Sequence, residues 1–320
     1  MRLFNHPVLC NYYLTYRCNA ACGFCDIWEK PSPYVTLENV TENLDSLRRM
    51  KVKVVDFTGG EPLLHRQIGD FLQLAKGKGF ITTVTTNCLL YPKYGDKLRG
   101  LVDMLHFSLD SVDREKHNAS RRVDCYDHLL RSIDLAKGWG EQPEILFTVK
   151  PDNVHEIPEL YEKFVVEKDL MVILNPIFSY NEVGEELAQE DLDTLLSWGK
   201  KPGIYLNDAF VALRKRGGNK VDDPVCLAGS TTVVISPENE LVLPCYHLGS
   251  KTIPILGNLE AAYASQEAQE IIALEGRLPE CEGCVVNCYM EPSMSVKTNR
   301  YFFSSLRSTL KYSLEKWVYA

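Results

Sequence analysis

The sequence predicts an α/β protein, a partial TIM-like (β/α)6 barrel followed by a small C-terminal unit of a β-hairpin and helices. From residue 8 to about 178, short apolar runs alternate with amphipathic stretches, which is typical of βα units and a parallel sheet. Beyond residue 225 this alternation stops, and a hairpin pattern follows between two cysteines. The 320 residues suffice for one large domain and a smaller one.

The barrel elements follow from hydrophobic spacing. Apolar runs predict six strands, over residues 9–16, 52–57, 80–86, 104–109, 145–149 and 172–177. Helical spacing predicts helices between them, over residues 37–50 behind a Thr36 N-cap, 67–77, 91–98, 126–138 and 157–166.

The rest of the chain divides into three parts behind a core at 1–178. We expect a connecting helical segment at 179–225, where an acidic run that includes Glu182 and Glu185 indicates a solvated helix face. Residues 226–300 carry the hairpin, 231–236 and 240–244, and a helix-like stretch at 259–274. The spacing of apolar residues within 301–320 predicts an amphipathic helix. Such a helix can lie on a membrane or a partner, but packing of its apolar stripe on the barrel is commoner. That stripe comprises Phe303, Leu306, Leu310, Leu314 and Trp317.

Bulk properties exclude several classes of function. The net charge of −8 argues against nucleic-acid binding, which needs a basic surface. No apolar run approaches the roughly 18–20 residues of a membrane span, and the N-terminus lacks a signal-peptide pattern. The eleven cysteines indicate metal ligands rather than disulfides. We therefore expect a cytoplasmic, oxygen-poor location.

Three cysteines lie directly after the first predicted strand. Cys18, Cys22 and Cys25 have C-x3-C-x2-C spacing. Thiolates are the usual ligands of iron–sulfur clusters, and a [4Fe–4S] cluster held wholly by protein takes four. Three ligands leave one iron open, as in catalytic metal sites. The spacing alone also suits zinc.

A second motif, Thr58-Gly59-Gly60-Glu61-Pro62, follows the second strand. Functional residues of such barrels lie at strand ends. With the aromatic Phe24 before Cys25, the two motifs resemble those of the radical S-adenosylmethionine (radical SAM) enzymes, C-x3-C-x-aromatic-C and Gly-Gly-Glu-Pro. The resemblance implies that SAM chelates the open iron. One electron then cleaves SAM to methionine and a 5′-deoxyadenosyl radical, which takes a hydrogen atom from an unreactive carbon.

The resemblance also implies a SAM site at the strand ends. Glycines without side chains let the backbone approach a ligand, and Glu61 is expected to accept from the SAM ammonium. We expect the Asn87 side chain to face SAM or the substrate, and Arg121 to bind the SAM carboxylate. Lys150 is expected in solvent, and Cys88 and Cys125 as buried small hydrophobes. No general acid or base is identified. The complete set of expected SAM-binding residues is Phe24, Gly59, Gly60, Glu61, Pro62, Asn87, Ser108, Asp110 and Arg121.

A second group of cysteines follows residue 225. It resembles the SPASM or twitch extension of radical SAM enzymes, which implies an auxiliary [4Fe–4S] cluster. Glu240 stands where the SPASM pattern usually has glycine, and the chain lacks the complete set of seven cysteines that holds two auxiliary clusters. Cys288 either replaces Cys226 as a ligand or packs nearby, and a closed zinc site remains an alternative. The expected ligands are Cys226, Cys245, Cys281 and Cys284, with Cys288 as the fifth candidate.

We expect an enzyme that abstracts hydrogen from a C–H or methyl carbon and oxidises or modifies a small molecule: a cofactor, tetrapyrrole, lipid or sugar. Flavodoxin or ferredoxin would supply the electron. A SPASM-type peptide or protein maturase is the alternative, which the first strand's start within ten residues disfavours, because it leaves no room upstream for a leader-binding module. A non-catalytic iron–sulfur electron carrier is a third reading. Gly-Gly-Glu-Pro argues against it, since a carrier needs no SAM site.

Overall fold

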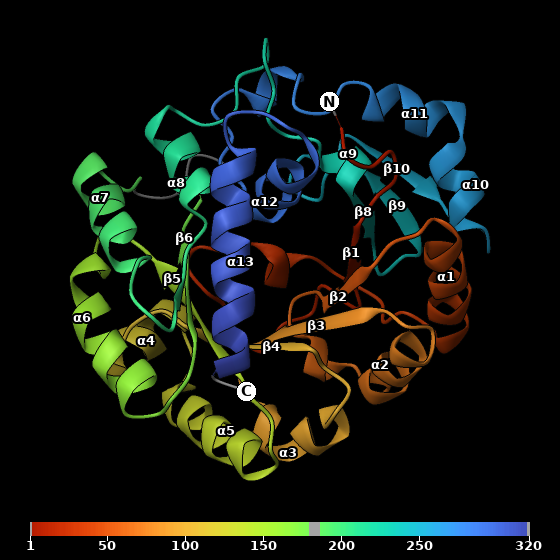
Figure 1. The fold of residues 1–320 in the computed structure, drawn as a ribbon. Coiled ribbons are helices and arrows are strands. Elements are labelled where there is room, and N and C mark those ends of the chain that lie inside the picture. Colours follow the sequence, from red (N-terminus) through yellow and green to blue (C-terminus); the bar gives the residue numbers. More distant parts are fainter. Residues whose placement is uncertain (1, 179–185, 319–320) are drawn as a thin grey trace.

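The computed structural model describes residues 2–178 and 186–318 (Figure 1). Its strands form one sheet in the order β10-β9-β8-β1-β2-β3-β4-β5-β6-β7. The strands β1 to β7 and β8 are parallel, and helices cover the outside of the curved sheet, which confirms the α/β partial barrel. The barrel strands are β1 (Leu9–Tyr13), β2 (Val54–Thr58), β3 (Ile81–Thr86), β4 (Met104–Leu109), β5 (Glu144–Val149), β6 (Val172–Pro176) and β7 (Ile204–Tyr205).

The helices of the barrel alternate with these strands. They are α1 (Leu37–Arg49), α2 (Ile68–Gly77), α3 (Tyr91–Tyr94), α4 (Arg114–Arg121), α5 (Tyr126–Gly138) and α6 (Ile157–Leu160), which continues as a π-helix (Tyr161–Val166). Short 3-10 turns occupy Ile27–Glu29, Pro62–Leu64, Gly95–Leu98, Val154–Glu156 and Pro279–Cys281. The predicted N-cap is confirmed, because Thr36 Oγ1 accepts a hydrogen bond from Asn39 N at 3.1 Å. Helix α4 was not predicted.

Helices also occupy the later half of the chain. They are α7 (Gln189–Trp198), α8 (Asp208–Lys215), α9 (Ala228–Thr231), α10 (Leu259–Ala264), α11 (Gln266–Ile272), α12 (Asn287–Val296) and α13 (Phe302–Val318). Of the expected acidic run, Glu182 and Glu185 lie outside the described residues. No helix in the described ranges is long and apolar enough to cross a membrane.

The predicted hairpin is joined to the barrel sheet. Strand β8 (Thr232–Ile235) lies parallel to β1, with Leu9 opposite Thr232, and β9 (Glu240–Leu243) returns antiparallel to β8. A further strand, β10 (Lys251–Pro254), extends the edge. A second buried cluster, which includes Tyr13, Phe210 and Tyr289, packs the C-terminal elements on the barrel.

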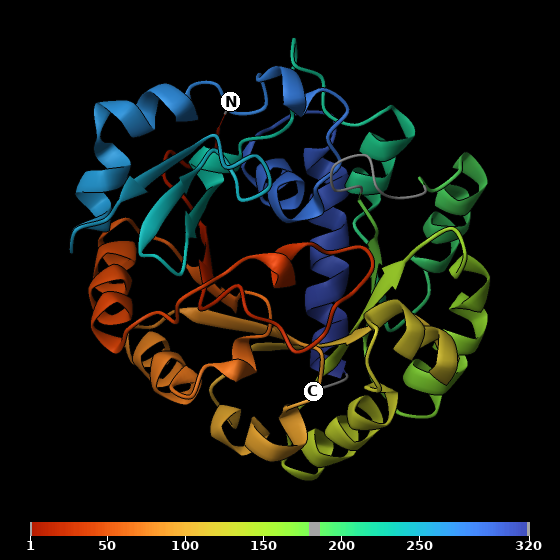
Figure 2. The same ribbon diagram turned by 180° about the vertical axis from the view of Figure 1, so that it is seen from behind.

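Helix α13 packs on the barrel through the face opposite to the expected one. Ser305 and Ser308 are 0% and 4% exposed, and Lys316 Nζ lies 2.6 Å from a carboxylate oxygen of Glu144. The stripe residues Phe303 and Leu314 are 75% and 71% exposed. The expectation of an inward apolar stripe was therefore wrong, because specific polar contacts orient the helix. Figures 1 and 2 show α13 on the side of the barrel away from the cysteine loop.

Candidate functional site

A cavity of about 300 Å³ lies at the carboxyl ends of the barrel strands. The loop between β1 and α1 crosses this end of the barrel (Figure 2). Most of the predicted N-terminal site residues line the cavity, whereas Pro62 and Asp110 are not on its wall. The predicted residues that line it are Cys18, Cys22, Phe24, Cys25, Gly59, Gly60, Glu61, Asn87, Ser108 and Arg121.

The cysteine loop is held by the end of α4. Ala21 N donates to Arg121 O at 3.2 Å, and Gly23 N donates to Ser120 O at 3.1 Å. These carbonyls lie at the C-terminus of a helix, where they have no partner within the helix. Burial raises the pKa of Cys18 and Cys25 to about 11, so these thiols must lose their protons when a metal cluster binds.

The two glycines of the second motif contact the chain that leads into this loop. A Cβ added to Gly59 would lie 2.2 Å from Thr15 O, and one added to Gly60 would lie 2.2 Å from Arg17 O. Gly60 N and Glu61 N donate to these same two oxygens, each at 2.9 Å. The glycines are thus required for close approach of two backbone segments, and both also line the cavity.

Glu61 is 1% exposed and joins this motif to the end of β3. Its carboxylate accepts hydrogen bonds from Thr86 Oγ1 at 2.8 Å, from Asn87 N at 2.9 Å and from Leu63 N at 3.1 Å. Burial raises the pKa of Glu61, and these hydrogen bonds partly offset the effect. The carboxylate therefore positions two strand-end loops in addition to lining the cavity.

The Asn87 side chain reaches the cysteine loop. Its Nδ2 lies 2.8 Å from Asn19 Oδ1 and 3.9 Å from Cys18 Sγ. Such a donor beside a cluster ligand orients the ligand and influences its charge.

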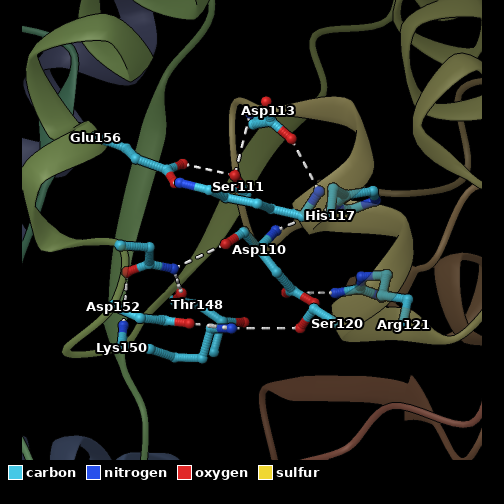
Figure 3. Close-up of polar contacts among 12 residues, drawn as sticks. Asp110, Ser111, Asp113, His117, Ser120, Arg121, Thr148, Lys150, Asp152 and Glu156 are labelled. Atoms are coloured by element: carbon cyan, nitrogen blue, oxygen red, sulfur yellow. Dashed lines mark hydrogen bonds and ion pairs between the residues drawn. The ribbon is translucent and has the colours of Figure 1, made fainter.

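Asp110 and Arg121 form a buried ion pair (Figure 3), of which Arg121 lines the cavity. Arg121 Nη2 lies 2.9 Å from Asp110 Oδ1, and Ser120 Oγ donates to Oδ2 at 3.1 Å. Burial alone would raise the pKa of Asp110, but the charge of Arg121 holds it below the usual value. The Asp110 carboxylate thus neutralises the charge of Arg121, and it faces α4.

Arg121 keeps one donor for another group. Its Nε is buried and has no hydrogen-bond partner among the described residues, although the side chain lines the cavity beside Cys22. A buried guanidinium with a free N–H fits an anionic ligand, such as the carboxylate of SAM or the sulfur of a cluster. The residues present therefore fit the cofactors that the motifs imply.

The same network contains residues that sequence analysis missed or placed elsewhere. His117 Nδ1 accepts from Asp110 N at 3.1 Å, and Asn153 Nδ2 donates to Asp110 O at 2.7 Å. Lys150, expected in solvent, points toward Ser120 at 3.4 Å (Figure 3). No motif marks these positions, because each acts through a neighbour on a different element.

The other two cysteines near this network are buried, as predicted. Cys88 and Cys125 are both fully buried, and Cys125 Sγ lies 3.2 Å from His117 Nε2.

A second cavity of about 720 Å³ lies beside the first and shares Ile177 and Phe178 with it. Cys288 is not on its wall, and its Sγ lies 3.8 Å from His247 Nε2. In the described chain no three His, Cys, Asp or Glu side chains are placed to hold a single metal ion. The predicted ligands on its wall are Cys226, Cys245, Cys281 and Cys284.

Asn219, which sequence analysis missed, ties these cysteine segments together. The side chain is fully buried, and its Oδ1 accepts from Cys226 N at 3.2 Å. Its Nδ2 donates to Cys281 O at 3.1 Å, and its backbone N donates to Cys284 O at 2.9 Å. One asparagine thus connects three of the four cysteines through their backbones.

Comparison with curated proteins finds relatives that match different shares of the chain. A probable GTP 3′,8-cyclase of Sulfurisphaera tokodaii is 24% identical over 81% of this chain and 87% of its own length. The GTP 3′,8-cyclase of Chlorobaculum tepidum is 34% identical over 38% of each chain. The S-adenosylmethionine-dependent nucleotide dehydratase RSAD2 of Siniperca chuatsi is 26% identical, and the match spans 42% of that relative. For these last two relatives the chain thus covers less than half of their length.

Solved structures resemble the fold over more of the chain. Streptococcus suis SuiB bound to the precursor peptide SuiA has a TM-score of 0.68 at 17% identity, covering 85% of this chain and 68% of SuiB. The native anSMEcpe with bound AdoMet and Kp18Cys peptide has a TM-score of 0.66 at 16% identity, covering 98% of both chains. The Radical SAM superfamily model matches residues 12–164, which hold the cysteine loop, the Gly-Gly-Glu-Pro motif and Arg121. These residues are therefore a radical SAM superfamily domain, of a family that uses SAM and a [4Fe–4S] cluster.

Proposed function

We propose that this protein is a radical SAM enzyme in which Cys18, Cys22 and Cys25 hold the SAM-cleaving cluster. The observation that carries the proposal is the convergence of three cysteines and the residues of three strand ends on one cavity, with a free donor of Arg121 beside Cys22. With cluster and SAM bound at these residues, the two cofactors would supply reductive cleavage of SAM, with one electron from a flavodoxin- or ferredoxin-type donor, and abstraction of one hydrogen atom from the substrate.

The residues of the chain itself position the cysteine loop and the SAM site. The end of α4 fixes the cysteine loop through the carbonyls of Ser120 and Arg121. Glu61 joins the loops that follow β2 and β3. Phe24 and Ser108 line the same cavity and suit the adenine and ribose of SAM, as the resemblance implies. Asp110 keeps Arg121 charged and in place for an anionic ligand.

We further propose an auxiliary [4Fe–4S] cluster on Cys226, Cys245, Cys281 and Cys284. The four share the wall of the larger cavity, and four thiolates complete the ligand set of a [4Fe–4S] cluster. When bound, such a cluster would supply an acceptor for the second electron of a substrate oxidation.

The substrate is proposed to be a small molecule held between the two cavities. A cavity of about 720 Å³ lies in the usual range for small-molecule sites. Relatives named as GTP 3′,8-cyclase and nucleotide dehydratase make nucleotides the first compounds to assay. The structural likeness to SuiB and anSMEcpe extends to the fold alone, so peptides form the second arm of the assay.

Product formation by anaerobically reconstituted protein tests the first proposal. With dithionite and SAM, the wild type should release 5′-deoxyadenosine, and Cys22→Ala should release none because a cluster ligand is lost. Cys10→Ala, which changes a buried cysteine of β1, serves as the matched control and should retain activity. Equal release from wild type and Cys22→Ala would refute the assignment, and absence of release from wild type would favour an electron carrier.

Iron analysis tests the second proposal. Two clusters require about eight irons per chain, and a variant with Cys18, Cys22 and Cys25 all changed to Ala should keep about four. A folded variant without iron would show that no auxiliary cluster exists. Four irons in the wild type together with one zinc would support the zinc alternative.

A further inference from the structure

The larger cavity contains a basic side chain to which nothing above assigns a task. Arg214 lies near the end of α8 and lines this cavity. Its Nη1 is buried and has no hydrogen-bond partner in the described part of the chain. Nearly all buried donors in folded proteins are paired, so an orphaned guanidinium N–H on a cavity wall indicates a ligand that the protein alone does not supply.

The fold holds this guanidinium in place. Helix α8 packs against α7, α12 and α13. The Arg214 Cζ lies 5.8 Å from the ring centroid of Phe210, one turn earlier on the same helix, and Phe210 is 1% exposed. An aromatic ring one turn away restrains the guanidinium plane by cation–π contact. The donor is therefore positioned before any ligand arrives.

The acidic residues of the cavity do not satisfy this donor. Glu186 acts on the charge of Arg214 but makes no hydrogen bond to its Nη1 among the described residues. Glu282 is paired with Lys220 at 2.8 Å, on the exposed side of its segment. Glu280 is exposed to solvent. Among the described residues that line the cavity, no buried acidic side chain pairs with the buried Nη1 of Arg214.

Arg214 is also distinct from the cysteine wall. It shares the cavity with Cys226, Cys245, Cys281 and Cys284 but belongs to α8, which carries none of them. Ile177 and Phe178 line both cavities and connect this space to the N-terminal site. A molecule between the cysteines and the proposed SAM site would thus border the cavity that Arg214 lines.

We propose that Arg214 binds an acidic group, a carboxylate or a phosphate, of the substrate. The planar guanidinium matches either group with two parallel hydrogen bonds. Substrate recognition as such rests on the proposed function, but the anion site itself can be measured without turnover. The inference restricts the substrate to anionic small molecules or to peptides with an acidic residue near the modified carbon.

Anion binding to the reconstituted holoenzyme tests the proposal. Inorganic phosphate and succinate are titrated calorimetrically, without oxygen and at low ionic strength, into the wild type, Arg214→Met and Arg214→Lys. Arg216→Gln, an exposed arginine at the end of the same helix, is the matched control. We expect Arg214→Met to weaken binding of the preferred anion at least tenfold, Arg214→Lys less, and Arg216→Gln less than twofold. Preference for phosphate or for succinate indicates which acidic group the substrate carries.

Equal affinity of the wild type and Arg214→Met, or no binding of either anion to the wild type, would overturn the proposal. Unfolding temperature and iron content are measured on each variant, and Arg214→Lys carries the test if the methionine variant does not fold. A purely structural role would lower the unfolding temperature of Arg214→Met and leave anion affinity unchanged. Release of 5′-deoxyadenosine without substrate, measured on the same samples, reports separately on the proposed function.

Discussion

Substitution of Gly60 by alanine tests how the second motif supports the first. The added Cβ would lie 2.2 Å from Arg17 O and 2.5 Å from Tyr16 O, and both atoms belong to backbone that cannot rotate away. The segment that leads to Cys18 must move by roughly 1 Å to restore ordinary contact at about 3.5 Å. We expect this movement to break the two hydrogen bonds that Gly60 N and Glu61 N donate to Thr15 O and Arg17 O, both 2.9 Å long.

The magnitude follows from these contacts. Two lost backbone hydrogen bonds contribute about 1 kcal/mol each, and overpacking of a tight site adds about 1–3 kcal/mol. The free energy of unfolding should therefore fall by about 3–5 kcal/mol, or roughly 5–10 °C in unfolding temperature. Because the displaced segment holds the first cysteine, iron at the N-terminal site should fall while iron at the C-terminal site remains.

The assay combines denaturant unfolding, iron analysis and release of 5′-deoxyadenosine. Gly77→Ala is the matched control, since a Cβ at this last residue of α2 meets no atom within 4 Å. It should be neutral or stabilising, because alanine favours a helix over glycine by up to about 1 kcal/mol. If Gly60→Ala had wild-type stability, iron content and product release, the argument from backbone approach would be refuted.

Three further predictions concern other parts of the fold. Asn219→Ala should lower iron from about eight toward about four per chain, because Asn219 holds the Cys226 and Cys281 segments together, while release of 5′-deoxyadenosine should persist. Asn5→Ala at the exposed N-terminus is the control. Unchanged iron in Asn219→Ala would contradict the role of Asn219. Burial alone would raise the pKa of Glu144, but His106 and Lys316 lower it to about 2. Since the unfolded value is about 4.3, the carboxylate stabilises the fold fully above about pH 5, and this contribution is lost as the pH falls toward 2. Glu144→Gln should flatten the decrease in the free energy of unfolding between pH 5 and pH 3, and an equally steep decrease in both proteins would refute the pairing. On α13, Leu314 is 71% exposed and Ser308 is 4% exposed. Leu314→Ser should therefore change the free energy of unfolding by less than about 0.5 kcal/mol, whereas Ser308→Leu should lower it by about 1–3 kcal/mol. A larger loss of stability in Leu314→Ser than in Ser308→Leu would mean that the apolar stripe faces the barrel.

Hydrophobic alternation was enough to predict the barrel. A strand of a parallel sheet is covered by helices, so an apolar run such as the one at 145–149 stands out from the amphipathic helices around it. The residues at strand ends were likewise predictable, because cysteine spacing and a glycine pair are local patterns. Most of these residues line one cavity.

The contacts that position these residues were not predictable. Gly60 approaches Arg17, and Asn219 reaches both Cys226 and Cys281, across long separations in sequence that no local pattern records. Helix α13 shows the same limit. Its hydrophobic period was correct for a helix, but periodicity cannot tell which face is buried when a polar partner such as Glu144 competes for the inner side.

The attachment of β8 to β1 explains why two groups of cysteines far apart in the sequence lie beside adjoining cavities. Tyr246 directly follows Cys245, stacks on Tyr13 of β1 at 4.4 Å between ring centroids, and accepts a hydrogen bond from Lys30 Nζ at 2.9 Å. Strand β1 leads directly into the loop of Cys18. Buried, close-packed aromatic rings resist displacement, so the relative position of the two cysteine groups is determined by the core rather than by a flexible linker between independent domains. A substrate between the cavities would therefore meet both groups at a separation that the protein sets before any cofactor binds.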